Sequence, residues 1–224
     1  MNGLLIVFEG PEGAGKSTQA RVLADDLRRN GLDVVLTREP GGTALGERIR
    51  SLLLHDEGYA MLAATEALLH AAARAQHVGE VIAPALARGG VVVSDRFVDS
   101  SYAYQGGGLG VPREELRAVQ RLATGGVMPD LRVLIDLPVV DGLARRLGDR
   151  DNVNRMDVAG LPFHERVRGA YLDLARDDPA GWVRVDGTGS VDRVAAAVAS
   201  AIRDRLGPRL ALLRREEGAV GVAS

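Results

Sequence analysis

The fold of this chain is decided by residues 4–18, which read LLIVFEGPEGAGKST. Residues 4–8 form a continuous apolar run, which is typical of a parallel strand buried on both faces. Residues 10–17 then fit the phosphate-loop pattern G-x-x-x-x-G-K-S/T at every fixed position. Apolar residues recur at helical spacing after Ser17, and Gly31 gives a stop signal. The stretch therefore predicts a strand, a glycine-rich turn and a helix, an arrangement whose backbone N–H groups bind phosphate.

Lys16 is the single lysine of the chain, since the other 27 of its 28 basic residues are arginine. This composition indicates that arginine serves wherever any positive charge is sufficient, and that Lys16 occupies a place where only a compact ammonium fits. We expect its ammonium to reach the β- and γ-phosphates of a nucleotide, and the hydroxyl of Ser17 to bind Mg²⁺. The residues expected to bind ATP are Gly10, Pro11, Glu12, Gly13, Ala14, Gly15, Lys16, Ser17 and Thr18.

The composition limits the functional classes. The chain has 224 residues, of which 46% are hydrophobic, and this is ample for a packed core. Its net charge is −2 and both signs are scattered, so nothing favours binding to nucleic acid or to an anionic membrane. The absence of cysteine excludes disulfides and thiol chemistry. The chain also has no signal-peptide pattern and no 18-residue apolar stretch, so we expect a cytoplasmic protein.

Apolar runs alternate with helical patterns, which indicates a single α/β domain over residues 1–213. Right-handed crossovers give a doubly wound, five-stranded parallel sheet with helices on both faces and ligands at the carboxyl ends of its strands. Pro84 should bend or divide the helix in which it lies. We expect residues 214–224 to form a disordered tail, because small residues dominate there. The expected strands are 3–9, 33–37, 91–95, 131–136 and 182–186, and the expected helices are 16–29, 43–54, 61–88, 113–124, 139–147, 161–176 and 190–206.

Polar segments follow the second and third expected strands. Residues 37–43, TREPGGT, contain a tight Pro-Gly-Gly turn, and the helix after it carries Arg48 and Arg50. Asp95 and Arg96 lie at the end of the third strand, at the edge where ligands bind. The aspartate can hold Mg²⁺ through water, and the arginine can bind a phosphate through two parallel hydrogen bonds. The alternatives are a surface ion pair for Asp95 and Arg96 and a solvated helix charge for Arg48.

Two further sets of residues stand out. His70 and Arg74 are one helical turn apart, so they share a face of the long helix. Residues 148–157, GDRDNVNRMD, form a polar segment that carries Arg150 and Arg155. The alternatives are a half-buried histidine without a role, a solvated arginine and an ordinary loop. On one sheet edge with a phosphate loop, however, these arginines indicate a site for two phosphorylated substrates.

Several motifs together resemble those of the bacterial thymidylate kinase family, and they span about residues 3–176. The phosphate loop alone is generic, but the combination of Arg-Glu-Pro-Gly-Gly with Asp-Arg and Tyr-Gln-Gly-Gly is specific to this family. The resemblance implies a P-loop kinase fold, a short mobile lid over about residues 148–160, and a homodimer formed through the long helices. The matching stretches are residues 8–18, 37–42, 94–96, 99–101, 103–107, 129–131 and 154–157.

This family transfers the γ-phosphate of ATP to dTMP, giving ADP and dTDP for dTTP synthesis, with Mg²⁺ as the metal. The resemblance implies that Lys16 holds the ATP phosphates and that the carboxylate of Glu12 meets the sugar 3′-hydroxyl of dTMP. Arg96 and Arg50 would clamp the dTMP phosphate, with Arg38 nearby. Because the acceptor phosphate is already an anion, its transfer requires positive charge and in-line positioning rather than a general base.

The resemblance also assigns a base site. Arg74 would donate a hydrogen bond to a thymine carbonyl, and Ser101 and Gln105 would contact the base. Tyr104 would fill the space of a ribose 2′-hydroxyl and so select deoxynucleotides. His70 departs from the family, which usually has a stacking phenylalanine there; a neutral imidazole stacks more weakly and can titrate near neutral pH.

The phosphate loop lacks an arginine, as in bacterial members of the family, and the lid would supply one, either Arg150 or Arg155. Two other functions remain to be weighed. The first is a kinase of another nucleoside monophosphate or small metabolite, which the base site alone would decide. The second is a regulatory switch such as a GTPase, but its Asn-Lys-x-Asp motif requires a second lysine, which this chain does not have.

Overall fold

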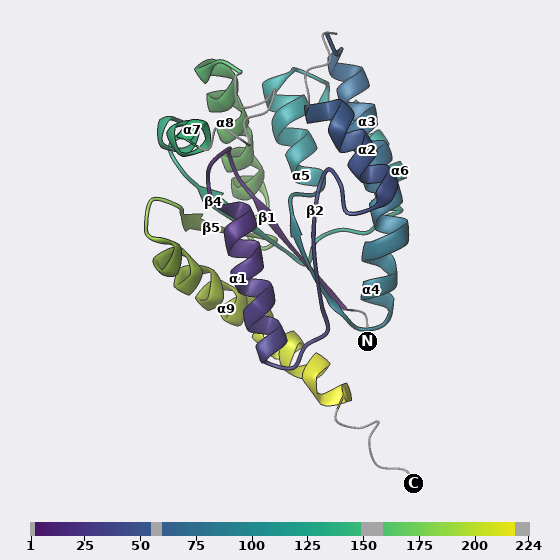
Figure 1. The fold of residues 1–224 in the computed structure, drawn as a ribbon, viewed down its shortest axis with the longest axis vertical. Coiled ribbons are helices and arrows are strands. Elements are labelled where there is room, and N and C mark those ends of the chain that lie inside the picture. Colours follow the sequence, from purple (N-terminus) through teal and green to yellow (C-terminus); the bar gives the residue numbers. More distant parts are fainter. Residues whose placement is uncertain (1–2, 55–59, 149–158, 218–224) are drawn as a thin grey trace.

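The computed structural model of the protein describes residues 3–54, 60–148 and 159–217, with side chains through residue 213. Its strands form a five-stranded, all-parallel sheet in the order β2-β3-β1-β4-β5 (Figure 1). Each expected strand is present, with ends that differ from the expectation by at most one residue, which confirms the predicted α/β fold. The strands are β1 (Leu4–Glu9), β2 (Val34–Arg38), β3 (Val91–Asp95), β4 (Leu131–Asp136) and β5 (Trp182–Asp186).

Helices cover both faces of the sheet (Figure 1), and β1 shows why its sequence is apolar throughout. Leu4, Ile6 and Phe8 pack into one hydrophobic cluster with α1 (Lys16–Arg29) and α9 (Val191–Glu217). Leu5 and Val7 pack into a second cluster on the opposite face, with α4 (Ala83–Ala87) and α5 (Val98–Ser101). All five side chains are fully buried, as expected for the centre of a sheet covered on both sides. The remaining helices are α2 (Ala44–Leu54), α3 (Ala63–His77), α6 (Arg113–Thr124), α7 (Val139–Gly148) and α8 (Leu161–Asp177).

The long helix expected over residues 61–88 is divided, as predicted. It consists of α3, a π-helical turn η1 (Val78–Ile82) and α4, with Pro84 in the first turn of α4. Because proline has no N–H to donate to the preceding turn, a hydrogen bond of the regular α-helix is lost at Pro84. No helix of the described residues is long and apolar enough to cross a membrane.

Residues 98–108 are helical, although no helix was expected there. They form α5 and a second π-helical segment, η2 (Tyr102–Gly108). Glycines normally weaken a helix, but here they allow close packing against α8. A Cβ atom at Gly107 would lie 2.7 Å from Cβ of Ala170, and one at Gly108 would lie 2.5 Å from the ring of Phe163. Tertiary packing therefore overrides the local preference at this position.

The last helix, α9, continues to Glu217, beyond the expected end at residue 206. Leu206, Leu210 and Leu213 belong to the same core cluster as β1, so burial of these side chains stabilises the additional turns despite Pro208. Residues 218–224 of the expected tail and residues 149–158 of the expected lid lie outside the described part of the chain.

We expect Gly107→Ala to lower the free energy of unfolding by about 1–3 kcal/mol, because its methyl group would overpack the contact between η2 and α8. Gly169→Ala on α8 is the matched control, since a Cβ atom there meets no atom within 4 Å. That substitution should be neutral or slightly stabilising in a helix. Urea denaturation of both variants checks the prediction, and equal stabilities would contradict it.

Candidate active site

The phosphate loop packs closely against β4 and α7. It joins β1 to the N-terminus of α1, which begins at Lys16. A Cβ atom at Gly10 would lie 2.4 Å from the carbonyl oxygen of Ile135 on β4, and one at Gly13 would lie 1.9 Å from that of Gly142 on α7. Both glycines also have positive φ, at 143° and 70°. Only glycine therefore fits, and the backbone of the loop and the helix N-terminus are presented to a ligand.

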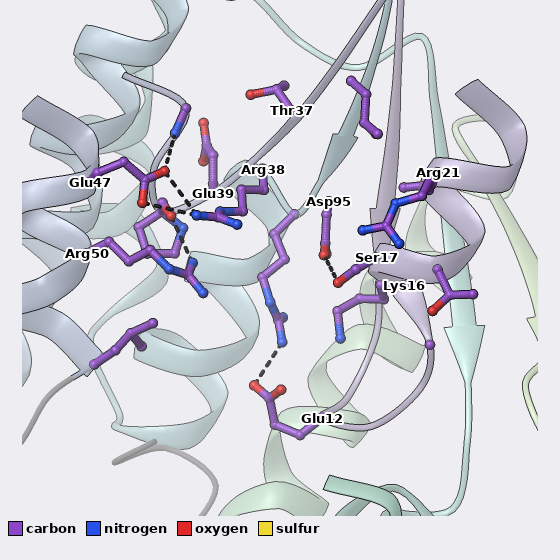
Figure 2. A pocket seen from close by; sticks show the side chains of 18 of the residues that line it. Glu12, Lys16, Ser17, Arg21, Thr37, Arg38, Glu39, Glu47, Arg50 and Asp95 are labelled. Carbon is purple, nitrogen blue, oxygen red and sulfur yellow. Dashed lines mark hydrogen bonds and ion pairs between the residues drawn. The ribbon is translucent and has the colours of Figure 1, made fainter. Parts of the chain in front are cut away.

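The loop forms one wall of a cleft of about 840 Å³. The other walls carry the polar residues that follow β2 and β3, and Figure 2 shows Lys16, Arg38 and Arg50 around this space. The structure thus brings together residues that were predicted from three separate strands. The members of the predicted site that line the cleft are Glu12, Gly13, Gly15, Lys16, Ser17, Thr18, Arg38, Arg50, Asp95 and Arg96.

The ammonium of Lys16 is held inside the loop. Its Nζ donates to the carbonyl oxygen of Pro11 at 2.7 Å, and the side chain is buried. Burial, and after it the positive charge of Arg96, lowers the pKa of Lys16 to about 8. The group therefore remains mostly protonated at neutral pH, and phosphate oxygens would compensate its charge.

Arg96 is the most extensively hydrogen-bonded cation of the described cleft. Its Nη2 donates to Glu12 Oε1 at 2.8 Å and to the hydroxyl of Tyr104 at 3.0 Å, and its Nη1 donates to the hydroxyls of Ser100 and Tyr171. Its φ of 74° lies in the left-handed region, which is unusual for a residue other than glycine. The guanidinium also lies over the ring of Tyr104, 4.8 Å from its centroid. These contacts fix the planar group at the edge of the sheet.

The carboxylate of Glu12 stays ionised beside this arginine. Its burial would raise the pKa, but the charges of Arg96 and Lys16 and a hydrogen bond from Tyr104 outweigh burial and lower the pKa to about 2. Figure 2 shows the Glu12 carboxylate pointing back toward the centre of the cleft. The pair therefore remains a charged pair over the whole physiological pH range.

Ser17 and Asp95 provide oxygen ligands next to the phosphate loop. The Ser17 hydroxyl donates to Asp95 Oδ2, and Oδ1 of Asp95 is buried with no hydrogen-bond partner among the described residues. Mg²⁺ is usually bound by one or two protein oxygens together with substrate phosphates and water. The described residues contain no group of three or more histidine, cysteine or acidic side chains that could hold a metal ion. The pair therefore fits a metal that is shared with a nucleotide.

Arg38 and Arg50 lie on the side of the cleft opposite the loop (Figure 2). Arg38 is exposed and forms an ion pair with Glu47 at 3.1 Å. Arg50 is half-buried and donates to the carbonyl oxygen of Pro40 at 2.9 Å. Burial, and after it the charge of Arg38, lowers the pKa of Arg50. The positive charge of these two arginines exceeds the negative charge of Glu47, so the two side chains are suited to bind an anion.

An apolar recess opens beside the cleft and shares Glu12, Pro40, Leu54 and Arg96 with it. Three residues of the predicted base site line this recess, namely His70, Tyr104 and Gln105. The predicted base site and phosphate site are therefore contiguous.

Arg74 and Ser101 do not line either cavity. Arg74 is 1% exposed, and its Nε donates to Glu39 Oε2 at 2.7 Å. Its Nη1 donates to Ser101 Oγ at 3.1 Å and to Gln120, and its Nη2 donates to the carbonyl oxygen of Phe97. Both residues are buried and line neither cavity, so their direct contact with a base stays a prediction.

Sequence reasoning missed two groups of buried residues. Glu9 ends β1 and accepts hydrogen bonds from the backbone N–H of Phe97, from Ser100 and from the hydroxyl of Tyr171. An acid at the end of a buried strand is the same signal that indicated Asp95, so the sequence could have revealed it. Nothing local marked Tyr171, because α8 lies far from the loop in sequence.

The second group supports Arg74. His77 lies with Nδ1 2.9 Å from Glu39 Oε1 and with Nε2 2.7 Å from Thr37 Oγ1. Glu39 was quoted within the Arg-Glu-Pro-Gly-Gly motif but was not expected to act. Arg145 and Arg146 of α7 also line the cleft, whereas Arg150 and Arg155 lie outside the described residues.

A glycine-rich loop opposite several arginines, at the carboxyl edge of a doubly wound parallel sheet, defines a P-loop phosphotransferase. A family model described as thymidylate kinase matches residues 8–198. The chain therefore belongs to the thymidylate kinase family.

Individual relatives agree with this family. A thymidylate kinase of Pseudomonas fluorescens (strain Pf0-1) is 55% identical over 186 residues, which are 83% of this chain and 88% of that protein. One of Thermomicrobium roseum is 52% identical over 193 residues, 86% of this chain and 91% of that protein. The crystal structure of thymidylate kinase from Ehrlichia chaffeensis matches with a TM-score of 0.74 and 30% identity, and the match covers 90% of this chain and all of that one.

We predict a pH-dependent effect of Glu9→Gln on stability. Burial, and after it the charge of Asp99, raises the pKa of Glu9 from 4.5 to about 7. Between these two values the unfolded chain releases the proton while the folded protein retains it, so the wild type loses stability as the pH rises, and the loss is complete above about 7. Glutamine cannot ionise, so the variant should gain stability relative to the wild type between pH 5 and pH 8.

Urea denaturation at several pH values measures this difference. Glu80→Gln on η1 is the control, because it makes the same substitution at an exposed glutamate. If the profiles of the Glu9→Gln variant and the wild type run parallel, Glu9 does not titrate in this range.

Proposed function

We propose that this protein transfers the γ-phosphate of ATP to dTMP, giving ADP and dTDP, as a step in dTTP synthesis. The observation that carries the proposal is a single cleft lined by two sets of groups that are suited to bind phosphate. Lys16 and the phosphate loop form one set, and Arg96 with Arg50 forms the other. A regulatory switch needs only the first set, whereas a nucleotide kinase needs both. Membership of the thymidylate kinase family supports dTMP as the acceptor.

The acceptor side is arranged for charge neutralisation. The phosphate of dTMP is an anion at neutral pH, and two negative groups approach each other only if positive charge lies between them. Arg96 would bind the acceptor phosphate, and its contacts with Glu12 and Tyr104 hold it in place before the substrate arrives. Arg50 and the more exposed Arg38 would complete the clamp. Glu12, at the border of cleft and recess, would lie beside the sugar 3′-hydroxyl.

The donor side is built on the loop. Lys16 and the N-terminus of α1 would hold the β- and γ-phosphates, so that the γ-phosphate faces the acceptor in line. Ser17 and Asp95 would hold Mg²⁺, which supplies positive charge to the phosphate oxygens when it is bound. Because Lys16 is buried, its interaction with the transferred phosphate would be stronger than the same interaction in water.

The recess would receive the thymine base. His70 would stack on it, and Tyr104 would block the position of a ribose 2′-hydroxyl. Gln105 would make a polar contact with the base. For Arg74 and Ser101 to reach a thymine carbonyl, as the family resemblance implies, Arg74 would have to redirect part of a guanidinium that is now bound to Glu39, Gln120 and Phe97.

Three finer points complete the proposal. Arg150 or Arg155 would act from a lid over about residues 148–160 and stabilise the transferring phosphate. The protein would act in the cytoplasm. It would form a homodimer through its long helices. Exposed apolar side chains at the start of α3, on α3 and on α6 support this, since Leu62, Leu68 and Leu122 are 74%, 58% and 86% exposed.

The function is tested by coupled ADP-release assays with ATP and Mg²⁺ against dTMP, dUMP, dCMP, dGMP, AMP and UMP. We expect a strong preference for dTMP. Preference for another monophosphate would overturn the base-site assignments but retain phosphoryl transfer. Absence of turnover with every acceptor would overturn the kinase proposal.

Arg96→Ala should reduce kcat/KM for dTMP by roughly 10²–10³-fold, because it removes a buried, hydrogen-bonded charge from the acceptor site. ATP binding, measured by calorimetry in the absence of dTMP, should change much less. Arg48→Ala on α2 is the control, since Arg48 is exposed and lines neither cavity. A variant at Arg96 with near-normal turnover would refute its role.

A further inference from the structure

One carboxamide contributes to the hydrogen-bonding character of the recess. Among the described residues that line it, Gln105 is the only one with a carboxamide, whose two ends present a donor and an acceptor. The others are apolar, aromatic, charged or hydroxyl-bearing. The orientation of the Gln105 side chain therefore decides whether this residue offers a donor or an acceptor to a base.

Glu66 fixes that orientation. It projects from the first turns of α3, is 1% exposed, and accepts a hydrogen bond from Gln105 Nε2 at 2.9 Å. A carboxylate has only acceptors, so the carboxamide must turn its NH₂ group toward Glu66. The opposite orientation would place two oxygens in contact inside the protein, at a considerable energetic cost. The carbonyl oxygen is then the end of the Gln105 carboxamide that remains for a ligand.

We propose that Glu66 is a specificity-positioning residue that makes the recess an acceptor for a base N–H group and thereby favours thymine and uracil over cytosine. This inference rests on the proposed function, because it requires a pyrimidine in the recess. N3 of thymine and of uracil carries a hydrogen and donates it, whereas N3 of cytosine is an acceptor. An oxygen held opposite N3 therefore pairs with the first two bases and opposes the lone pair of the third.

The contact also helps to hold η2 against α3, so a purely structural role is the competing explanation. A second hydrogen bond also connects α3 with the segment that contains Gln105, because Arg74 of α3 donates to Ser101 of α5. Loss of a purely structural contact would lower activity toward every acceptor by a similar factor. Loss of the proposed role would change the ratio between acceptors, and the experiment depends on this difference.

The test is Glu66→Gln, assayed with dTMP, dUMP and dCMP. The new carboxamide can donate to the Gln105 oxygen, so Gln105 becomes free to present its NH₂ group to the recess. We expect the ratio of kcat/KM for dTMP over dCMP to fall by about 10- to 100-fold, the range for an unpaired buried polar group. The ratio for dTMP over dUMP should stay constant, because both bases carry a hydrogen at N3.

Glu80→Gln is the matched control. Glu80 accepts a hydrogen bond from Gln76 one turn earlier, in an exposed Gln–Glu pair on the same helical segment. Its substitution should leave both ratios unchanged. An equal loss with dTMP, dUMP and dCMP in the Glu66→Gln variant would overturn the inference.

A second variant covers the case in which Glu66→Gln does not fold. The exchange Glu66→Gln with Gln105→Glu keeps the hydrogen-bonded pair and again directs an acceptor oxygen into the recess. It should retain the preference of the wild type for dTMP over dCMP, and loss of that preference would overturn the inference. If the wild type itself does not prefer dTMP, the proposed function fails, and this outcome is visible before any variant is measured.

Discussion

The ion pair between Arg96 and Glu12 is the interaction on which the site depends. It connects the segment after β3 with the phosphate loop after β1, two strands that are hydrogen-bonded neighbours in the sheet. The backbone N–H of Arg96 also donates to the carbonyl oxygen of Phe8, which extends the pairing of these strands into the site. Because the carboxyl ends of adjacent parallel strands lie side by side, the cation and the phosphate loop must face the same cleft.

Buried carboxylates support the cationic groups from behind. Glu9, Ser100 and Tyr171 form a hydrogen-bonded group behind Arg96. Glu39 bridges Arg74 and His77 in the same way. Removal of one partner from a buried ion pair such as Arg74–Glu39 costs roughly 3–5 kcal/mol, so Arg74 is held in position before any ligand binds. A site that is ordered in advance stabilises developing charge without first having to reorganise.

The differences between expectation and structure have local causes. The helix over residues 98–108 was missed because glycines at 106–108 argue against a helix, yet they permit its contact with α8. The base-site role of Arg74 came from the family resemblance and stays a prediction, whereas the helical spacing indicated only that Arg74 shares a face with His70. That face is shared, but Arg74 lies deeper and binds Glu39. Helical periodicity gives the side of a helix on which a residue lies, and it does not give the depth.

The sequence by itself determined the parallel sheet, the phosphate loop and the edge at which Asp95 and Arg96 lie. These features follow from short patterns of apolar residues and glycines, because such patterns act within a few residues of the chain. Only the tertiary structure decided which arginines face the cleft and which are neutralised inside the protein. Arg74 binds Glu39 across 35 residues, and Arg132 binds Asp99 across 33. Such partners are chosen by the packing of whole helices against the sheet, which no local pattern encodes.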